Sequence, residues 1–82
     1  MGNKLTERLE RQRKQRTKWR REVESAERDW RDCSAEDREQ MRTELSMLLE
    51  RLRPNIEASN VDDFTKADLV ERVQALHQQV TQ

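Results

Sequence analysis

The chain contains few of the residues that interrupt helices or build large cores. Its 82 residues include one glycine, one proline, one cysteine, one histidine, three aromatic side chains and no tyrosine. The scarcity of glycine and proline removes the strongest local breaks and favours long helices. Hydrophobic residues make up 32% of the chain and charged residues 41%, which leaves a thin core for a single copy. We therefore expect an all-α homodimer.

The same scarcity argues against catalytic and metal chemistry. Cys33 is the only cysteine, so no internal disulfide can form, and the chain fits a reducing, cytoplasmic compartment. One cysteine and the single His77 do not supply the three or four ligands of a metal site, and a lone histidine has no orienting partner to make it a working base. No glycine-rich loop is present to hold phosphate. We expect no enzyme, metal or cofactor.

Long apolar runs are also missing. No stretch approaches the ~20 apolar residues that a membrane-spanning helix needs. The charged start of the chain does not resemble a secretory signal. These features predict a cytoplasmic protein.

Charge is divided unevenly along the chain, although the formal net charge is zero. Residues 1–21 hold nine lysines or arginines against Glu7 and Glu10, a net charge of +7. The other 61 residues hold eight basic and fifteen acidic side chains, a net charge of −7. This asymmetry predicts a basic segment for a polyanion on an acidic body.

A first helix is predicted over about residues 4–33. Its apolar positions recur at alternating gaps of four and three residues, which is the spacing of a heptad seam. Two polar residues interrupt the seam in its first half, so its second half is expected to pack better. The seam consists of Leu5, Leu9, Gln12, Arg16, Trp19, Val23, Ala26, Trp30 and Cys33.

Two further helices follow. Ser34 and Asp37 have the spacing of a capping box and predict a second helix over about residues 35–53, which Pro54 should end. The apolar phase slips between Cys33 and Met41, which favours a hairpin over one continuous helix. A loop is expected at 54–62, and a third helix at about 63–79, capped by Asp62, Asp63 or Thr65.

These elements predict a single helical domain at 1–82 that dimerises. The first two helices would form an antiparallel hairpin, and two hairpins would pair into a four-helix bundle. The third helix would cover one end through Phe64, Leu69 and Val73. The side chains expected in the core or the dimer contact are Leu9, Trp19, Val23, Trp30, Leu45, Leu48 and Leu52.

The positive signal for function is a row of cations on the first helix. They recur at gaps of three, four and seven residues, broadly opposite the seam, and several lie where the helix macrodipole disfavours positive charge. The row is about 25 Å long at ~1.5 Å per residue, long enough to follow phosphates along a nucleic acid. These candidate nucleic-acid-binding residues, the basic stripe, are Lys4, Arg8, Arg11, Lys14, Lys18 and Arg21.

Recognition of the phosphate backbone is favoured over recognition of bases. The stripe has no asparagine and few glutamines for reading base edges, and no helix-turn-helix, zinc or RNA-recognition motif is present. Duplex RNA is commonly recognised by its shape, through phosphates and 2′-hydroxyls, so double-stranded RNA is favoured over DNA. Trp19 lies among the basic residues and could stack on a base, but its seam position favours burial.

Two resemblances extend this prediction. Residues 10–20, Glu-Arg-Gln-Arg-Lys-Gln-Arg-Thr-Lys-Trp-Arg, resemble the arginine-rich RNA-binding helices of lambdoid phage antiterminators and lentiviral Rev proteins. The plan of the whole chain is similar to the small silencing suppressors of insect nodaviruses, in which two long helices and a shorter third dimerise into a four-helix bundle on duplex RNA. That resemblance implies sequestration of double-stranded RNA from the host Dicer machinery.

Two alternatives use the same residues differently. Gly2 with Thr6 fits the N-myristoylation pattern, and an acyl chain beside a polybasic segment would make a peripheral membrane protein. Alternatively, the charges only solubilise a coiled-coil adaptor that binds other proteins. Binding to nucleic acid or to anionic lipid at moderate salt would distinguish those two functions from that of an adaptor, which should bind neither.

Overall fold

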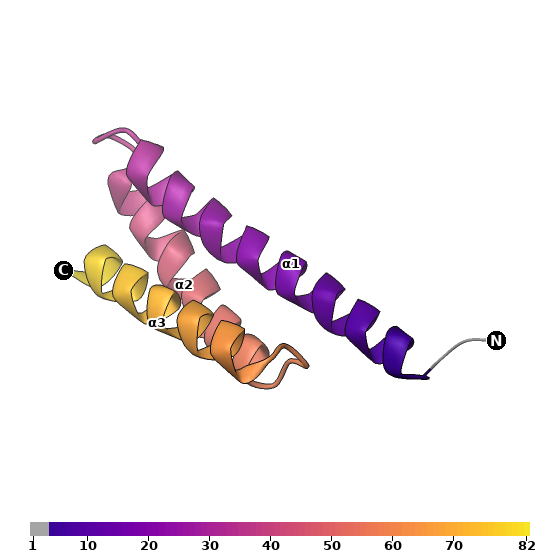
Figure 1. Ribbon diagram of the computed structural model, residues 1–82. Helices are drawn as coiled ribbons and strands as arrows, with labels where there is room; N and C mark the ends of the chain where they lie inside the picture. Colours follow the sequence, from indigo (N-terminus) through magenta and orange to yellow (C-terminus); the bar gives the residue numbers. More distant parts are fainter. Residues whose placement is uncertain (1–3) are drawn as a thin grey trace.

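A computed structural model of the protein describes residues 4–82, which form helices joined by short turns. Its three helices are α1 (Lys4–Asp32), α2 (Arg38–Glu57) and α3 (Asp63–Thr81). The helix α2 runs antiparallel to α1, and α3 returns parallel to α1, so the three lie side by side (Figure 1). The expectation of an all-α fold with three helices is confirmed. Gly2 of the acylation motif lies outside the described residues.

One apolar core runs between the three helices. The second half of α1 supplies Trp19, Val23, Ala26 and Trp30, the well-packed half of the predicted seam. Because α3 lies along the other two helices and does not cap one end, a single copy closes its own core. The other buried apolar residues are Leu45, Leu49, Leu52 and Ile56 of α2, Val61, and Leu69, Val73, Leu76 and Val80 of α3.

Three apolar residues expected at packed positions are exposed. Leu9, 53% exposed, belongs to the first turns of α1, which extend past the α2–α3 loop (Figure 1). Leu48 is 39% exposed because its neighbour Leu49 takes the inward position. Phe64 is 84% exposed, and the following Thr65 is buried in its place. The core of one copy therefore excludes them.

The turn between α1 and α2 contains the predicted capping pair but lies ahead of the helix. The Ser34 hydroxyl donates to the Asp37 carboxylate at 3.0 Å, and the Asp37 amide donates back to the Ser34 hydroxyl at 3.2 Å. Residues 35–37 form the turn that this pair closes, so α2 starts at Arg38, three residues later than predicted.

Pro54 lies inside α2 and does not end it, so the predicted helix end at residue 53 is wrong. A proline within a helix costs about 3 kcal/mol through its missing N–H and the clash of its ring. Here Ile56 is fully buried one turn beyond Leu52, and burying a side chain of that size contributes about 1.5–3 kcal/mol. The Ala58 amide also donates to the Pro54 carbonyl at 3.0 Å. Burial of Ile56 therefore offsets the proline.

The helix α3 begins with a side-chain cap. Asp62 has extended backbone dihedrals, and its carboxylate accepts from the Thr65 amide at 3.0 Å. The Thr65 hydroxyl donates to the same carboxylate at 2.8 Å. These hydrogen bonds, the amide bond first, lower the pKa of Asp62 below its ordinary value of 3.8. Asp62 is thus the N-cap among the three predicted candidates, and it also orients Thr65 inward.

The depressed pKa of Asp62 predicts a loss of stability in acid. Because the folded-state pKa lies below the unfolded value, the contribution is complete above the ordinary carboxyl range and is lost as pH falls through the folded-state pKa. Thermal unfolding between about pH 5 and pH 2 should therefore show a shallower decline in Asp62→Asn than in the unchanged protein. An equal decline of the melting temperature with falling pH in the two proteins would show that this cap does not couple folding to protonation.

Candidate nucleic-acid interface

The N-terminal half of α1 carries a cationic surface open to solvent. All six residues of the basic stripe are exposed, on the part of the helix that begins beyond the α2–α3 loop and continues along the bundle. The buried residues of α1 begin at Trp19, so the basic half of the helix contributes little to the core. The stripe comprises Lys4, Arg8, Arg11, Lys14, Lys18 and Arg21.

Few ion pairs within the chain neutralise the cations of this surface. Within residues 4–82, Arg16 is the only cation of the first 21 residues that pairs with a carboxylate, with Nε 3.5 Å from the Asp62 Oδ1. The other ion pairs of the described chain join Arg31 to Asp32, Arg53 to Glu57, and Arg72 to Glu27, all outside the stripe. The acidic body therefore does not neutralise the stripe within one copy.

Four of the cations gather around one shallow hollow on the outside of α1. Arg13, Lys14, Lys18 and Arg21 line it together with Thr17. The Thr17 hydroxyl donates to the Arg13 carbonyl at 3.0 Å, and the charged side chains that line the hollow are all cations. Arg13 was not among the predicted contact residues. Its spacing of four and eight residues from Thr17 and Arg21, one face of a helix, is the signal that would have included it.

A second hollow involves the α2–α3 loop. Arg8 and Arg11 line it with Gln12 and with Asn60, a loop residue that no sequence pattern singled out. Lys4, in the first turn of α1, lines neither hollow. The stripe thus falls into two cationic groups along one helix, the nearer to the N-terminus being flanked by a loop amide. Such an arrangement suits successive backbone phosphates better than one compact anion.

Trp19 is a core residue and is not exposed for stacking on a base. Its side chain is 9% exposed, and its indole N–H donates to the Gln15 side chain at 3.0 Å. The Lys18 ammonium lies over the ring, 4.7 Å from its centroid. Contact with the tryptophan ring therefore positions Lys18 at the edge of the core, where it remains exposed.

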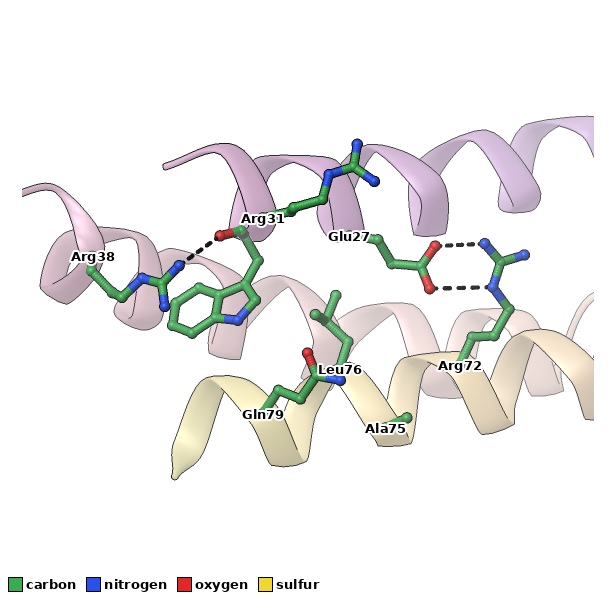
Figure 2. A pocket seen from close by; sticks show the side chains of 8 residues that line it. Glu27, Arg31, Arg38, Arg72, Ala75, Leu76 and Gln79 are labelled. Atoms are coloured by element: carbon green, nitrogen blue, oxygen red, sulfur yellow. Dashed lines mark hydrogen bonds and ion pairs between the residues drawn. The ribbon is translucent and has the colours of Figure 1, made fainter. Parts of the chain in front are cut away.

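The other end of the bundle shows arginines used for structure. In the hollow of Figure 2, Arg72 makes a two-pronged ion pair with Glu27, which raises the pKa of the arginine. Arg38 donates to the Trp30 carbonyl at 3.2 Å and lies 4.3 Å from the centroid of its ring. Arg31, also in this lining, is 3.3 Å from Asp32. Each guanidinium here has a protein partner, whereas those of the stripe have no ion pair among residues 4–82.

Other kinds of site find little support in the described chain. Across residues 4–82, no group of three or more histidine, cysteine or carboxylate side chains is placed to hold a metal ion. No helix in that range has the length and apolar character to cross a bilayer. Comparisons with protein-family models, with curated proteins and with solved structures found no match.

Proposed function

We propose that this protein binds the backbone of double-stranded nucleic acid, RNA in preference to DNA, through the basic stripe of α1. The observation that carries the proposal is the pairing pattern of the cations. Nine lysines and arginines precede Glu22. Of these nine, only Arg16 forms an ion pair with a carboxylate within residues 4–82. A surface whose cations are neither neutralised internally nor buried is suited to an external polyanion.

The chemistry of the stripe favours phosphates over bases. Six of the nine cations are arginines, whose planar guanidinium groups match phosphate oxygens. The only tryptophan among them, Trp19, is buried, which removes the aromatic group that would stack on an unpaired base. Backbone contacts along a rigid helix recognise the shape of a duplex and not its sequence.

We further propose that the protein acts as a homodimer in the cytoplasm. The motive is the resemblance that the sequence bears, in the order of its three helices, to the nodavirus silencing suppressors, which implies sequestration of duplex RNA from the host silencing machinery as the biological role. Two copies of α1 would double the cationic surface that one duplex meets. Each copy already encloses a core, so dimerisation would join surfaces and would not complete a fold.

Gel-shift titrations test the proposal directly. Duplex RNA, duplex DNA and both single strands, each in two unrelated sequences, should be compared at about 50 and 200 mM salt. We expect duplex RNA to bind best and the two sequences to bind equally. Affinity should fall as salt rises, because binding releases counterions from the duplex and this release is less favourable in concentrated salt. Absence of binding to every duplex at the lower salt concentration would overturn the proposal.

The same titrations address the two alternatives. Anionic vesicles compete for the stripe if its natural target is a lipid surface, and that function further requires acylation of Gly2, so Gly2→Ala would release the protein from membranes in cells. A coiled-coil adaptor would bind neither duplexes nor vesicles at moderate salt. Preference for duplex RNA over vesicles, unchanged in Gly2→Ala, is the result that the proposed function requires.

A further inference from the structure

The helix α1 is longer than the part of the bundle that covers it. Its first turns extend past the α2–α3 loop, and Asn60 of that loop shares a hollow with Arg8 and Arg11 (Figure 1). The segment from Lys4 to Arg11 forms the projecting end of the helix. It carries Leu5 and Leu9, which are 62% and 53% exposed.

These two leucines continue the core-facing seam of α1. Leu5 and Leu9 are four residues apart, and gaps of three, four and three lead through two polar positions to the buried Trp19. At ~100° per residue the two leucines therefore point to the same side of the helix as the core residues. The seam thus extends beyond the α2–α3 loop.

We propose that the projecting ends of two copies dock antiparallel when the copies bind head to head on one nucleic-acid duplex. This inference rests on the proposed function. Its occupant is a second copy of this chain, because a duplex that follows the basic stripe holds copies next to one another, and a two-fold pairing sets Lys4 level with Glu10 of the partner subunit. The contact would join two basic stripes into one continuous surface.

The register of the pair follows from the heptad spacing. In an antiparallel pair the two kinds of seam position face each other, so Leu5 lies opposite the partner's Leu9 and the partner's Leu5 lies opposite Leu9. The two-fold axis is then level with Glu7, which points away from the seam on the outer side of the helix. The same register brings Lys4 level with Glu10 of the partner subunit, a pair of opposite charge.

The size and charge of the contact explain why the duplex is needed. Two half-exposed leucines per copy bury far less than the ~1,200 Å² of a stable protein interface. Arg8 borders the seam, so the pair brings two guanidinium groups together, which opposes association in the absence of an anion. A phosphate backbone neutralises both and holds the copies at a high effective concentration.

The length of the joined surface sets the substrate. Arg21 lies 14 residues from the two-fold axis in each copy, so the cationic surface extends about 42 Å at ~1.5 Å per residue. That length corresponds to about 15 base pairs of A-form RNA duplex at ~2.8 Å each, whereas one copy covers about 25 Å, or about nine base pairs. A stem of about 10 base pairs therefore accommodates one copy, and a stem of about 20 accommodates the pair.

Titration of RNA hairpins with these two stem lengths tests the inference. The unchanged protein should bind the short stem without cooperativity and the long stem with a Hill coefficient approaching two. Leu5→Ser/Leu9→Ser should keep its affinity for the short stem within about twofold and lose cooperativity on the long one. Met47→Ser/Leu48→Ser, which removes two exposed apolar side chains from α2, is the matched control and should remain cooperative.

The outcomes separate this inference from the proposed function. If the unchanged protein binds neither stem, the proposed function itself fails. If it binds both stems without cooperativity, or if the Leu5/Leu9 variant stays cooperative or loses the short stem, binding is real and the inference is wrong.

Disulfide trapping on the long stem checks the register separately. In a Cys33→Ser background, chains carrying Leu5→Cys should cross-link mainly to chains carrying Leu9→Cys. Glu7→Cys, on the outer side of the helix, should cross-link weakly. Dominant cross-linking through residue 7 would overturn the antiparallel register.

Discussion

Replacement of Arg11, Lys14, Lys18 and Arg21 by alanine should abolish binding to duplexes at moderate salt and leave the fold intact. All four side chains are exposed, and none forms an ion pair within residues 4–82. On a B-form duplex each phosphate contact is worth nearly one decade of affinity in 0.1 M salt, so four lost contacts weaken binding by about 1,000-fold or more. The slope of log affinity against log salt should become shallower by about 3.6.

A charge-matched variant distinguishes the effect of the position of the cations from the effect of their number. Arg28, Arg31, Arg51 and Lys66 lie outside the N-terminal half of α1, and their replacement by alanine removes the same four charges. We expect this control to lose far less affinity, because net charge acts at long range and is screened by salt. Far-ultraviolet circular dichroism should show equal helicity in both variants. Equal loss of binding in the two would show that no specific surface exists.

Replacement of Leu49 by alanine should destabilise the protein by about 2–5 kcal/mol, the cost of a cavity at a fully enclosed leucine. Leu49 is 1% exposed and lies in the middle of α2, where it faces the shared core. A small domain has a total stability of about 5–15 kcal/mol, so this single change removes a large part of it. Urea denaturation followed by circular dichroism measures the difference in the free energy of unfolding. The slope of that free energy against urea concentration should not change.

The neighbouring Leu48 provides the control for this prediction. It is the same residue type on the same helix, but it is 39% exposed. Leu48→Ala should change stability by no more than about 0.5 kcal/mol, which is usual for a surface substitution. If Leu48→Ala cost as much as Leu49→Ala in the isolated protein, Leu48 would be buried in a contact between copies.

The role of the cations near the α2–α3 loop follows from their neighbours. Arg16 is tied to the capping carboxylate of Asp62, whereas Arg8 and Arg11 line a hollow beside Asn60. The loop therefore marks a boundary on α1, with a structural arginine at its level and binding candidates on either side. The projecting end beyond this boundary is where a second copy would meet the first.

Much of the fold could be predicted from the sequence because its signals are local. The heptad spacing of Trp19, Val23, Ala26 and Trp30 predicted which side of α1 is buried, and near absence of glycine and proline predicted helices throughout. The capping pair of Ser34 and Asp37 marked the turn within three residues. Each of these features depends on neighbours within one or two helical turns.

The helix end at Pro54 and the places of Phe64 and Leu48 could not be predicted in the same way. Local preference ends a helix before proline, but burial of Ile56 against the other helices continues it. Phe64 is the more apolar residue, yet the cap of Asp62 turns Thr65 inward and leaves the ring in solvent. At Pro54 packing between helices outweighed the preference of the residue itself, whereas at Phe64 and Leu48 the neighbouring residue took the inward position on the helix.

The sequence by itself determined the helical class of this protein, the three segments, and the position of nine cations ahead of residue 22, because periodicity, capping and charge are written in consecutive residues. Only the tertiary structure decided that α3 lies along α1 and α2, that Arg16 alone of those cations is paired within residues 4–82, and that the first turns of α1 extend past the α2–α3 loop and leave Leu5 and Leu9 exposed. These outcomes depend on contacts between residues about 45 positions apart and on the relative lengths of packed helices, which no local pattern encodes.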